Sequence, residues 1–71
     1  MEWMSVESYV VARVRYDAEA RTLDIEFRSG KIYRYCDVRT ATYDEFVAAE
    51  SKGQFFNAHI RDRFICDLIG P

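Results

Sequence analysis

Residues 22–35, TLDIEFRSGKIYRY, decide the fold because they contain two strand-like segments joined by a glycine turn. From Leu23 to Phe27 apolar residues alternate with polar ones, which is the pattern of a strand with one buried face. The second segment carries Tyr33 and Tyr35 on either side of an arginine. The face that these two rings take decides whether the sheet is packed core or binding surface.

The turn leaves two registers open, and they give the tyrosines opposite environments. A two-residue loop would pair Ile25 with Arg34 and leave both tyrosines in solvent. A three-residue loop, with Gly30 in the left-handed conformation, would instead pair Ile25 with Tyr33. It would also set Arg34 opposite Asp24. Because an unpaired guanidinium is costly to bury, we predict the three-residue loop and place both tyrosines at the edge of the core.

A further strand is predicted over residues 9–16, YVVARVRY, which are mostly β-branched or aromatic. Residues 17–21 are polar and suit a hairpin connection. The expected register joins Tyr16 to Leu23, Val14 to Ile25, Ala12 to Phe27, Arg15 to Asp24 and Arg13 to Glu26. Apolar groups then meet on one face and opposite charges on the other.

After Val38 the apolar residues follow the spacing of a helix. Thr42 followed by Glu45 has the pattern of a capping box, so a first helix is expected to begin there and to end before Gly53.

A second helix is predicted after Asn57, which we expect to be its cap. Its buried side would carry Ile60, Phe64 and Leu68. The expected fold is therefore α+β, with a three-stranded antiparallel meander packed on two short C-terminal helices, in a single domain over residues 1–71.

The composition indicates one small folded domain. Of the 71 residues, 49% are hydrophobic and 15% aromatic, which is enough for a core. A chain this short buries only about 60% of the surface that its unfolded form exposes, so its stability margin is thin. Ten basic and twelve acidic residues give a net charge of −2. The totals therefore lack the basic excess that phosphate-binding proteins usually carry.

The residue types that carry catalysis are sparse. Cys36, Cys66 and His59 are the thiols and the imidazole of the chain, and the sequence shows no group that would orient them. We therefore expect no enzyme activity, no metal site and no cofactor. Two cysteines, no signal peptide and no long apolar run predict a soluble cytoplasmic protein without membrane contact.

A set of short motifs follows a fixed order from about residue 6 to residue 64. They are Tyr16-Asp17, Leu23-x-Ile25-x-Phe27, Gly30, Tyr33-x-Tyr35, Val38, Tyr43 and Gly53-x-Phe55-Phe56-Asn57 followed by Ile60-Arg61. This layout resembles the KTSC domain, a module found at the C-terminus of some bacterial lysyl-tRNA synthetases and as small free-standing proteins. The resemblance implies a meander followed by helices, and its synthetase context implies RNA binding. Arg39 departs from the pattern, because a proline often follows the valine in the family.

If RNA is the ligand, bases would stack on rings and guanidinium groups would meet phosphates. The candidate residues are Arg61, Arg63, Tyr33, Tyr35, Arg34 and Asn57. Arg61 and Arg63 are the stronger ones, because only Asp62 is an acidic neighbour in sequence. The others have structural interpretations as core edge, cross-strand ion pair and helix cap.

A protein partner or a second copy of the chain is the alternative. Apolar side chains are frequent near both ends of the sequence, and an exposed apolar patch formed by them would be a protein-binding surface. The candidates are Trp3, Met4, Ile65, Leu68 and Ile69. The sequence leaves the choice between RNA and protein open.

Overall fold

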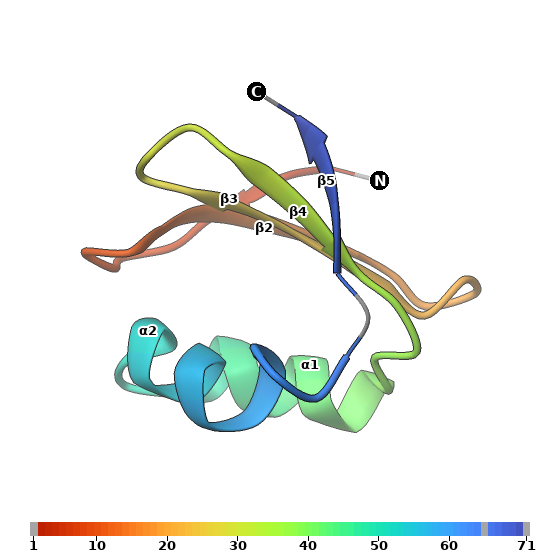
Figure 1. Ribbon diagram of the computed structural model, residues 1–71. Helices are drawn as coiled ribbons and strands as arrows, with labels where there is room; N and C mark the ends of the chain where they lie inside the picture. Colours follow the sequence, from red (N-terminus) through yellow and green to blue (C-terminus); the bar gives the residue numbers. More distant parts are fainter. Residues whose placement is uncertain (1, 65, 71) are drawn as a thin grey trace.

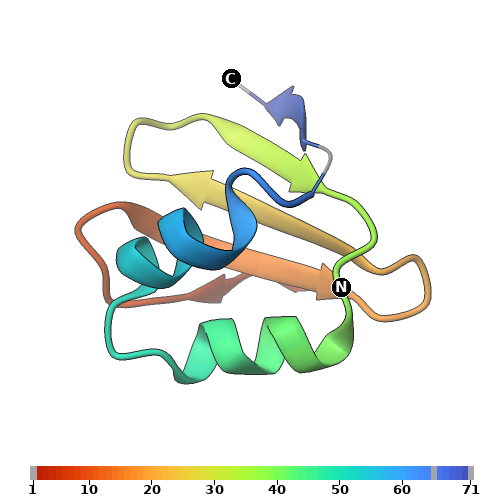
Figure 2. The same ribbon diagram turned by 60° about the horizontal axis from the view of Figure 1, so that its bottom comes forward.

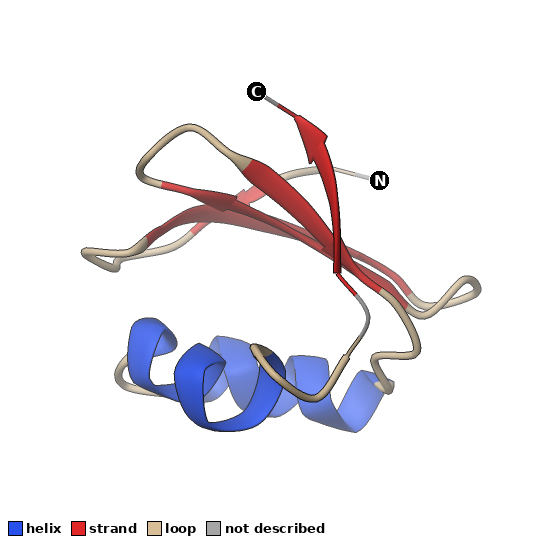
Figure 3. Cartoon of the chain, in the orientation of Figure 1, coloured by secondary structure: helices blue, strands red, loops and turns tan. Residues whose placement is uncertain are grey.

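The computed structural model describes residues 2–64 and 66–70, and it arranges them in two layers (Figure 1). Within these residues, one layer is an antiparallel sheet of five strands that follow one another in chain order. The helices form the other layer and lie on one face of the sheet (Figure 3). The predicted α+β class is confirmed, but the sheet has one more strand at each edge than the predicted meander.

The bounds of the elements are as follows. The strands are β1 (Met4–Ser5), β2 (Val11–Asp17), β3 (Thr22–Phe27), β4 (Ile32–Tyr35) and β5 (Cys66–Gly70). The helices are α1 (Thr40–Ala48), α2 (Lys52–Phe55) and the π-helical turn η1 (Phe56–Ile60). Figure 2 looks onto the helical layer, which lies over the β1 to β3 side of the sheet while β4 and β5 extend beyond it.

The hairpin of β2 and β3 has the predicted register over most of its length. The confirmed pairs are Tyr16 with Leu23, Arg15 with Asp24, Val14 with Ile25 and Arg13 with Glu26. Apolar groups therefore share the helix-covered face, and charged groups share the outer face.

The end of this hairpin near residue 10 departs from the prediction. Val11, not Ala12, lies opposite Phe27, because a β-bulge shifts the register between Val11 and Arg13. The extra residue of a bulge moves the preceding side chains to the opposite face. As a result Val11 is buried in the core, whereas Val10 precedes the strand and is 45% exposed.

The second hairpin has the predicted three-residue loop. The Phe27 amide donates to the Lys31 carbonyl at 2.9 Å, and the Gly30 amide donates to the Phe27 carbonyl at 2.9 Å. Gly30 has a φ of 97°, a backbone conformation that suits glycine. The loop sets Tyr33 opposite Ile25, as predicted.

The first helix begins two residues before the predicted capping box. Its N-cap is Arg39, which makes no side-chain capping bond, so the prediction of a cap at Thr42 is wrong. Tyr16 of β2 fixes this start instead: its hydroxyl donates to the Val38 carbonyl at 2.5 Å, and its ring stacks on Tyr43 with centroids 4.5 Å apart. Tertiary contacts therefore replace the local cap.

Gly53 does not end a helix, contrary to prediction. It lies inside α2 and is buried, and a Cβ atom there would stand 3.2 Å from Cγ2 of Val10. α1 ends earlier, since Ala49 is already extended. A new cap opens α2, where the Ser51 hydroxyl accepts from the Gln54 amide at 3.2 Å.

The predicted second helix is only partly correct. Asn57 is not its cap, because α2 continues directly into η1 and leaves Asn57 exposed within that turn. Ile60 is buried as expected, and Phe64 packs against the core beyond the end of η1. Leu68 belongs to β5, not to a helix, and is 58% exposed. β5 pairs with β4, whose backbone groups would otherwise form an open sheet edge.

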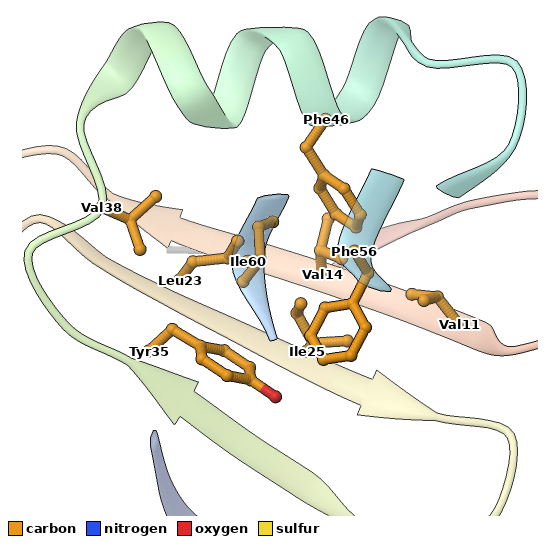
Figure 4. Packing of buried hydrophobic residues seen from close by; sticks show 9 residues of the cluster. All are labelled: Val11, Val14, Leu23, Ile25, Tyr35, Val38, Phe46, Phe56 and Ile60. Carbon is orange, nitrogen blue, oxygen red and sulfur yellow. The ribbon is translucent and has the colours of Figure 1, made fainter. Parts of the chain in front are cut away.

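The core fills the space between the two layers (Figure 4). Its buried residues are Val11, Val14, Leu23, Ile25, Tyr35, Val38, Phe46, Phe56 and Ile60. The central strands supply the aliphatic floor, and α1 and η1 contribute the rings that cover it. Burial of this apolar surface is the main force that holds the helices on the sheet.

Candidate functional site

Two adjoining hollows lie beside the turn between β3 and β4, and they share a wall formed by Tyr9, Val10 and Arg28. The aromatic hollow measures about 630 Å³ and is also lined by Phe27, Ser29, Tyr33, Tyr35, Phe56, Arg61 and Asp62. The polar hollow measures about 720 Å³ and is also lined by Glu7, Ser8, Glu50, Ser51, Lys52, Gly53, Gln54 and Asn57. The fold thus gathers four predicted RNA-binding residues around one region: Tyr33, Tyr35, Arg61 and Asn57.

The wall of the aromatic hollow is built from rings that hold one another edge to face. Phe27 contacts Tyr33 with ring centroids 5.9 Å apart and Phe56 with centroids 5.2 Å apart. Phe56 in turn contacts Tyr35 at 5.5 Å. Such T-shaped pairs fix the rings firmly, so the wall is formed before any ligand arrives.

The two central tyrosines have different exposures. Tyr35 is 3% exposed and belongs to the core, so its ring is not open for stacking. Tyr33 is half-buried and packs against the edge of the core. Of this pair, Tyr33 is the ring that a ligand in the hollow can reach over a larger area.

The most exposed ring at this site is Tyr9, which the sequence assigns to a strand and not to a binding surface. Tyr9 is fully exposed in the loop before β2. The Ser8 hydroxyl accepts from the amides of Val10 and Val11 at 3.1 Å each, which turns the chain before the strand begins. A serine directly before an apolar run is the signal that could have found this turn.

Arg28, in the β3–β4 turn, makes hydrogen bonds to the loop that carries Tyr9. Its Nε donates to the Ser8 carbonyl at 3.1 Å, and its backbone amide donates to the Val10 carbonyl at 2.9 Å. Its Nη2 also donates to the Val6 carbonyl at 3.5 Å, but Arg28 as a whole is exposed and lines both hollows. It is therefore both a positioning group and a cation open to a ligand.

Arg61 and Asp62 follow η1 directly and are both exposed at the aromatic hollow. Within residues 2–64 and 66–70, the ion pairs all lie on the outer face of the sheet, and neither residue takes part in one. Arg63 is also exposed but does not line either hollow. The structure therefore separates Arg61 from Arg63, which the sequence treats alike.

Arg34 lies on the other side of the sheet, where it binds Asp24. Its Nε donates to Oδ1 of Asp24 at 2.8 Å and its Nη2 donates to Oδ2 at 3.0 Å, while Nε of Arg15 donates to Oδ2 at 2.7 Å. Burial by itself raises the pKa of the Asp24 carboxyl, but the hydrogen bonds and charges of Arg34 and Arg15 outweigh it and hold the pKa below its ordinary value. Arg34 is thus a structural group and not part of the hollows.

The charges that line the two hollows balance. The basic residues are Arg28, Lys52 and Arg61, and the acidic ones are Glu7, Glu50 and Asp62. A long run of phosphates would therefore find no uniformly positive track here. What the two hollows offer is aromatic surface together with a few separate cations.

Of the three residues considered for catalysis, the structure describes the side chains of two, Cys36 and His59. Cys36 is a half-buried free thiol, and His59 is exposed with its ring 4.6 Å from that of Phe55. The side chain of Cys66 lies outside the described part. Among the described residues, no group of three His, Cys, Asp or Glu side chains could hold a metal ion.

The candidates for protein contact are divided between the two edges of the sheet. Met4 is exposed on β1, whereas Leu68 and Ile69 are exposed on β5. The guanidinium groups of Arg13 and Arg15 each lie 4.5 Å from the centre of the Trp3 ring. Ile65 lies outside the described residues. The described members of this set therefore do not form one apolar patch.

Comparison with known proteins gives first the class and then the particular relatives. The sequence matches the KTSC domain over residues 7–64, so the chain belongs to the KTSC domain family. The crystal structure of a KTSC domain protein from Yersinia pestis has a TM-score of 0.94 at 35% identity, over 97% of both chains. None of the described helices has the length and apolar character needed to cross a membrane.

Relatives by sequence are of two sizes. A lysine–tRNA ligase of Nostoc punctiforme is 38% identical over 58 residues, which cover 82% of this chain and 10% of the ligase. A protein of Tsukamurella paurometabola is 36% identical over 59 residues, which cover 83% of this chain and 88% of that protein. The chain thus spans about a tenth of the ligase and most of the small protein.

Proposed function

We propose that this KTSC domain is an accessory module that binds unpaired RNA, with a base in the aromatic hollow. The observation that carries the proposal is the combination of an exposed ring, Tyr9, with two exposed arginines, Arg28 and Arg61, around one aromatic-walled hollow. Unpaired bases stack on aromatic side chains, and arginine binds phosphate oxygens. The exposed ring and the two arginines therefore match the base and the phosphate of a nucleotide.

The shape and charge favour a single strand over a duplex. A hollow beside one turn can receive a base that is splayed out of a strand, whereas duplex RNA is recognised by contacts to phosphates and riboses over many base pairs. The arginines of the outer face, Arg13, Arg15 and Arg34, are engaged in ion pairs with acidic groups. They offer no open basic track for a duplex.

The family context supports RNA as the ligand class. Relatives at 36–38% identity occur within enzymes named as lysine–tRNA ligases, whose substrate is a transfer RNA. A small domain that holds an unpaired nucleotide would suit such an enzyme as an accessory module. The same module could act alone in a protein of this size.

The proposal can be tested with a labelled single-stranded RNA of about ten nucleotides, followed by fluorescence anisotropy at low salt. Tyr9→Ala should weaken binding about tenfold, because loss of one stacked ring is worth about 1–3 kcal/mol. Arg61→Gln should weaken it several-fold. Arg63→Gln is the matched control, since that arginine is exposed but lies outside both hollows.

The outcomes separate the possibilities clearly. Tyr9 is fully exposed, so its removal leaves the core intact and a loss of binding reports on the ligand. Absence of salt-dependent binding to any single strand would overturn the proposal. Equal loss from Arg61→Gln and Arg63→Gln would also contradict it, because the hollow would then have no special part. Capture of a protein and not RNA at Tyr9 would point to the alternative partner class.

A further inference from the structure

The acidic side chain of Asp62 leads to a further inference, which rests on the proposed function. Among the residues that line the aromatic hollow, Asp62 is the acidic one, and it is exposed directly after Arg61. It takes no part in the ion pairs found within residues 2–64 and 66–70. A carboxylate beside a bound nucleotide repels the phosphates, and hydrogen bonds that it accepts from the base can offset this cost.

We infer that the aromatic hollow prefers guanine, with the Asp62 carboxylate as the group that reads its Watson–Crick edge. An ionised carboxylate only accepts hydrogen bonds, and its two oxygens can take two parallel donors. Guanine presents two such adjacent donors, N1–H and the N2 amino group. The pairing is the base-edge counterpart of the bidentate contact between arginine and a carboxylate.

The other bases match a carboxylate less well. Adenine and cytosine each place an acceptor nitrogen beside their amino donor, so a second carboxylate oxygen would face a lone pair. Uracil places its single N3–H donor between two carbonyl acceptors. For these bases, part of the Asp62 carboxylate would remain without a partner and close to unfavourable charge.

The arginines complete the complementarity to guanine. The O6 and N7 atoms of guanine are acceptors, and arginine is their commonest protein partner. Arg28 and Arg61 line the same hollow as Asp62. One carboxylate beside two guanidinium groups thus offers acceptors and donors in the combination that guanine needs, while the rings of Tyr9 and Tyr33 are available to stack on its faces.

The inference can be tested with four labelled oligouridine strands of about seven nucleotides whose central residue is G, A, C or U. The strand with central G should bind about tenfold more tightly than the others. Asp62→Asn should reduce this preference to within about twofold, because an amide offers one acceptor and one donor group in place of two acceptors. Its affinity for the all-uridine strand should stay the same or rise.

Asp67→Asn is the matched control, since it makes the same change of charge at an exposed residue on β5, away from both hollows. It should keep the full preference for G. If all four strands bind equally in a Tyr9-dependent manner, the inference fails and the proposed function stands. If no strand binds, both fail. A preference for G that survives Asp62→Asn would overturn the role of Asp62.

Discussion

At the scale of single residues, Asp24 shows how a charged group can be buried on an open sheet face. Its side chain is only 3% exposed, although the helices of the described residues all lie on the other face of the sheet (Figure 1). The long side chains of Arg15 and Arg34 cover the carboxylate and donate the hydrogen bonds that replace water. Since both arginines stay partly exposed, their guanidinium groups keep part of their hydration, and the cluster carries a smaller burial penalty than a pair in the core.

Asp24→Asn should lower the free energy of unfolding by about 2 kcal/mol at pH 7, as expected for loss of hydrogen bonds to charged groups. The amide would also leave two neighbouring guanidinium groups without their anion. Urea denaturation followed by circular dichroism measures the change. The control is Glu26→Gln, which breaks the more exposed pair with Arg13 and should cost less than about 1 kcal/mol.

The same variant gives a pH dependence. Because the pKa of Asp24 is lower in the folded state, its stabilising contribution is full above the unfolded-state pKa of about 3.9 and is lost as the pH falls through the folded pKa. The difference between the parent and Asp24→Asn should therefore be constant near neutral pH and shrink below about pH 4. Parallel stability curves down to pH 2 would contradict the assigned role of this carboxylate.

At the scale of elements, the β3–β4 turn depends on one backbone conformation. Gly30 has a φ of 97°, and a Cβ atom there would meet no other atom within 4 Å. The cost of a side chain at this position is therefore conformational and not a clash. Gly30→Ala should destabilise the protein by about 1–2 kcal/mol, with Ser29→Ala in the same turn as the control. Equal midpoints in urea for both variants would contradict this assignment, because they would show that the backbone conformation of Gly30 carries no such cost.

The registers of both hairpins could be predicted because the alternation of apolar residues and the pairing of charges agree. The cost of burying Arg34 without a partner decided the choice of loop, and the structure confirms the resulting register, in which Arg34 lies opposite Asp24. The bulge beside Val11 could not be predicted in the same way. Apolar and polar residues alternate acceptably over residues 9–16 without a bulge. The sequence therefore does not show whether Val10 or Val11 points into the core, and the folded structure decides it.

The last element shows why β5 escaped prediction. Ile60, Phe64 and Leu68 are spaced by four, which fits a helix, while the residues from Cys66 onward also fit a strand. What decides between them is the free edge of β4, and that is a tertiary feature. β1 was missed because its two residues carry no period at all.

The candidate site was predictable only in part, for a related reason. The sequence indicates Tyr33, Arg61 and Asn57 by residue type and resemblance, and the fold brings them to the two hollows. The bulge in β2 places Tyr9 beside the β3–β4 turn, and the end of η1 places Asp62 there. No local sequence pattern predicts that the loop before β2, the β3–β4 turn and the segment after η1 lie next to one another.

At the scale of the whole molecule, charge is divided between two regions. The outer face of the sheet carries three arginines that are satisfied by buried or half-buried acids. The cations around the hollows, Arg28, Lys52 and Arg61, take no part in those ion pairs, and acidic residues line the same hollows. With a net charge of −2 overall, binding of RNA would rest on few phosphate contacts and on stacking.

This division predicts a shallow salt dependence. Each phosphate neutralised on a single strand contributes about −0.7 to the slope of log K against log salt, so three cations allow a slope of about −2 at most. Anisotropy titrations at several salt concentrations measure it, and Arg61→Gln should reduce the slope by about 0.7, whereas Arg63→Gln should leave it unchanged. A slope near −5 would need about seven phosphate contacts, which is more than the three cations of the hollows supply. The binding surface would then extend well beyond the hollows, and the proposed site would be wrong.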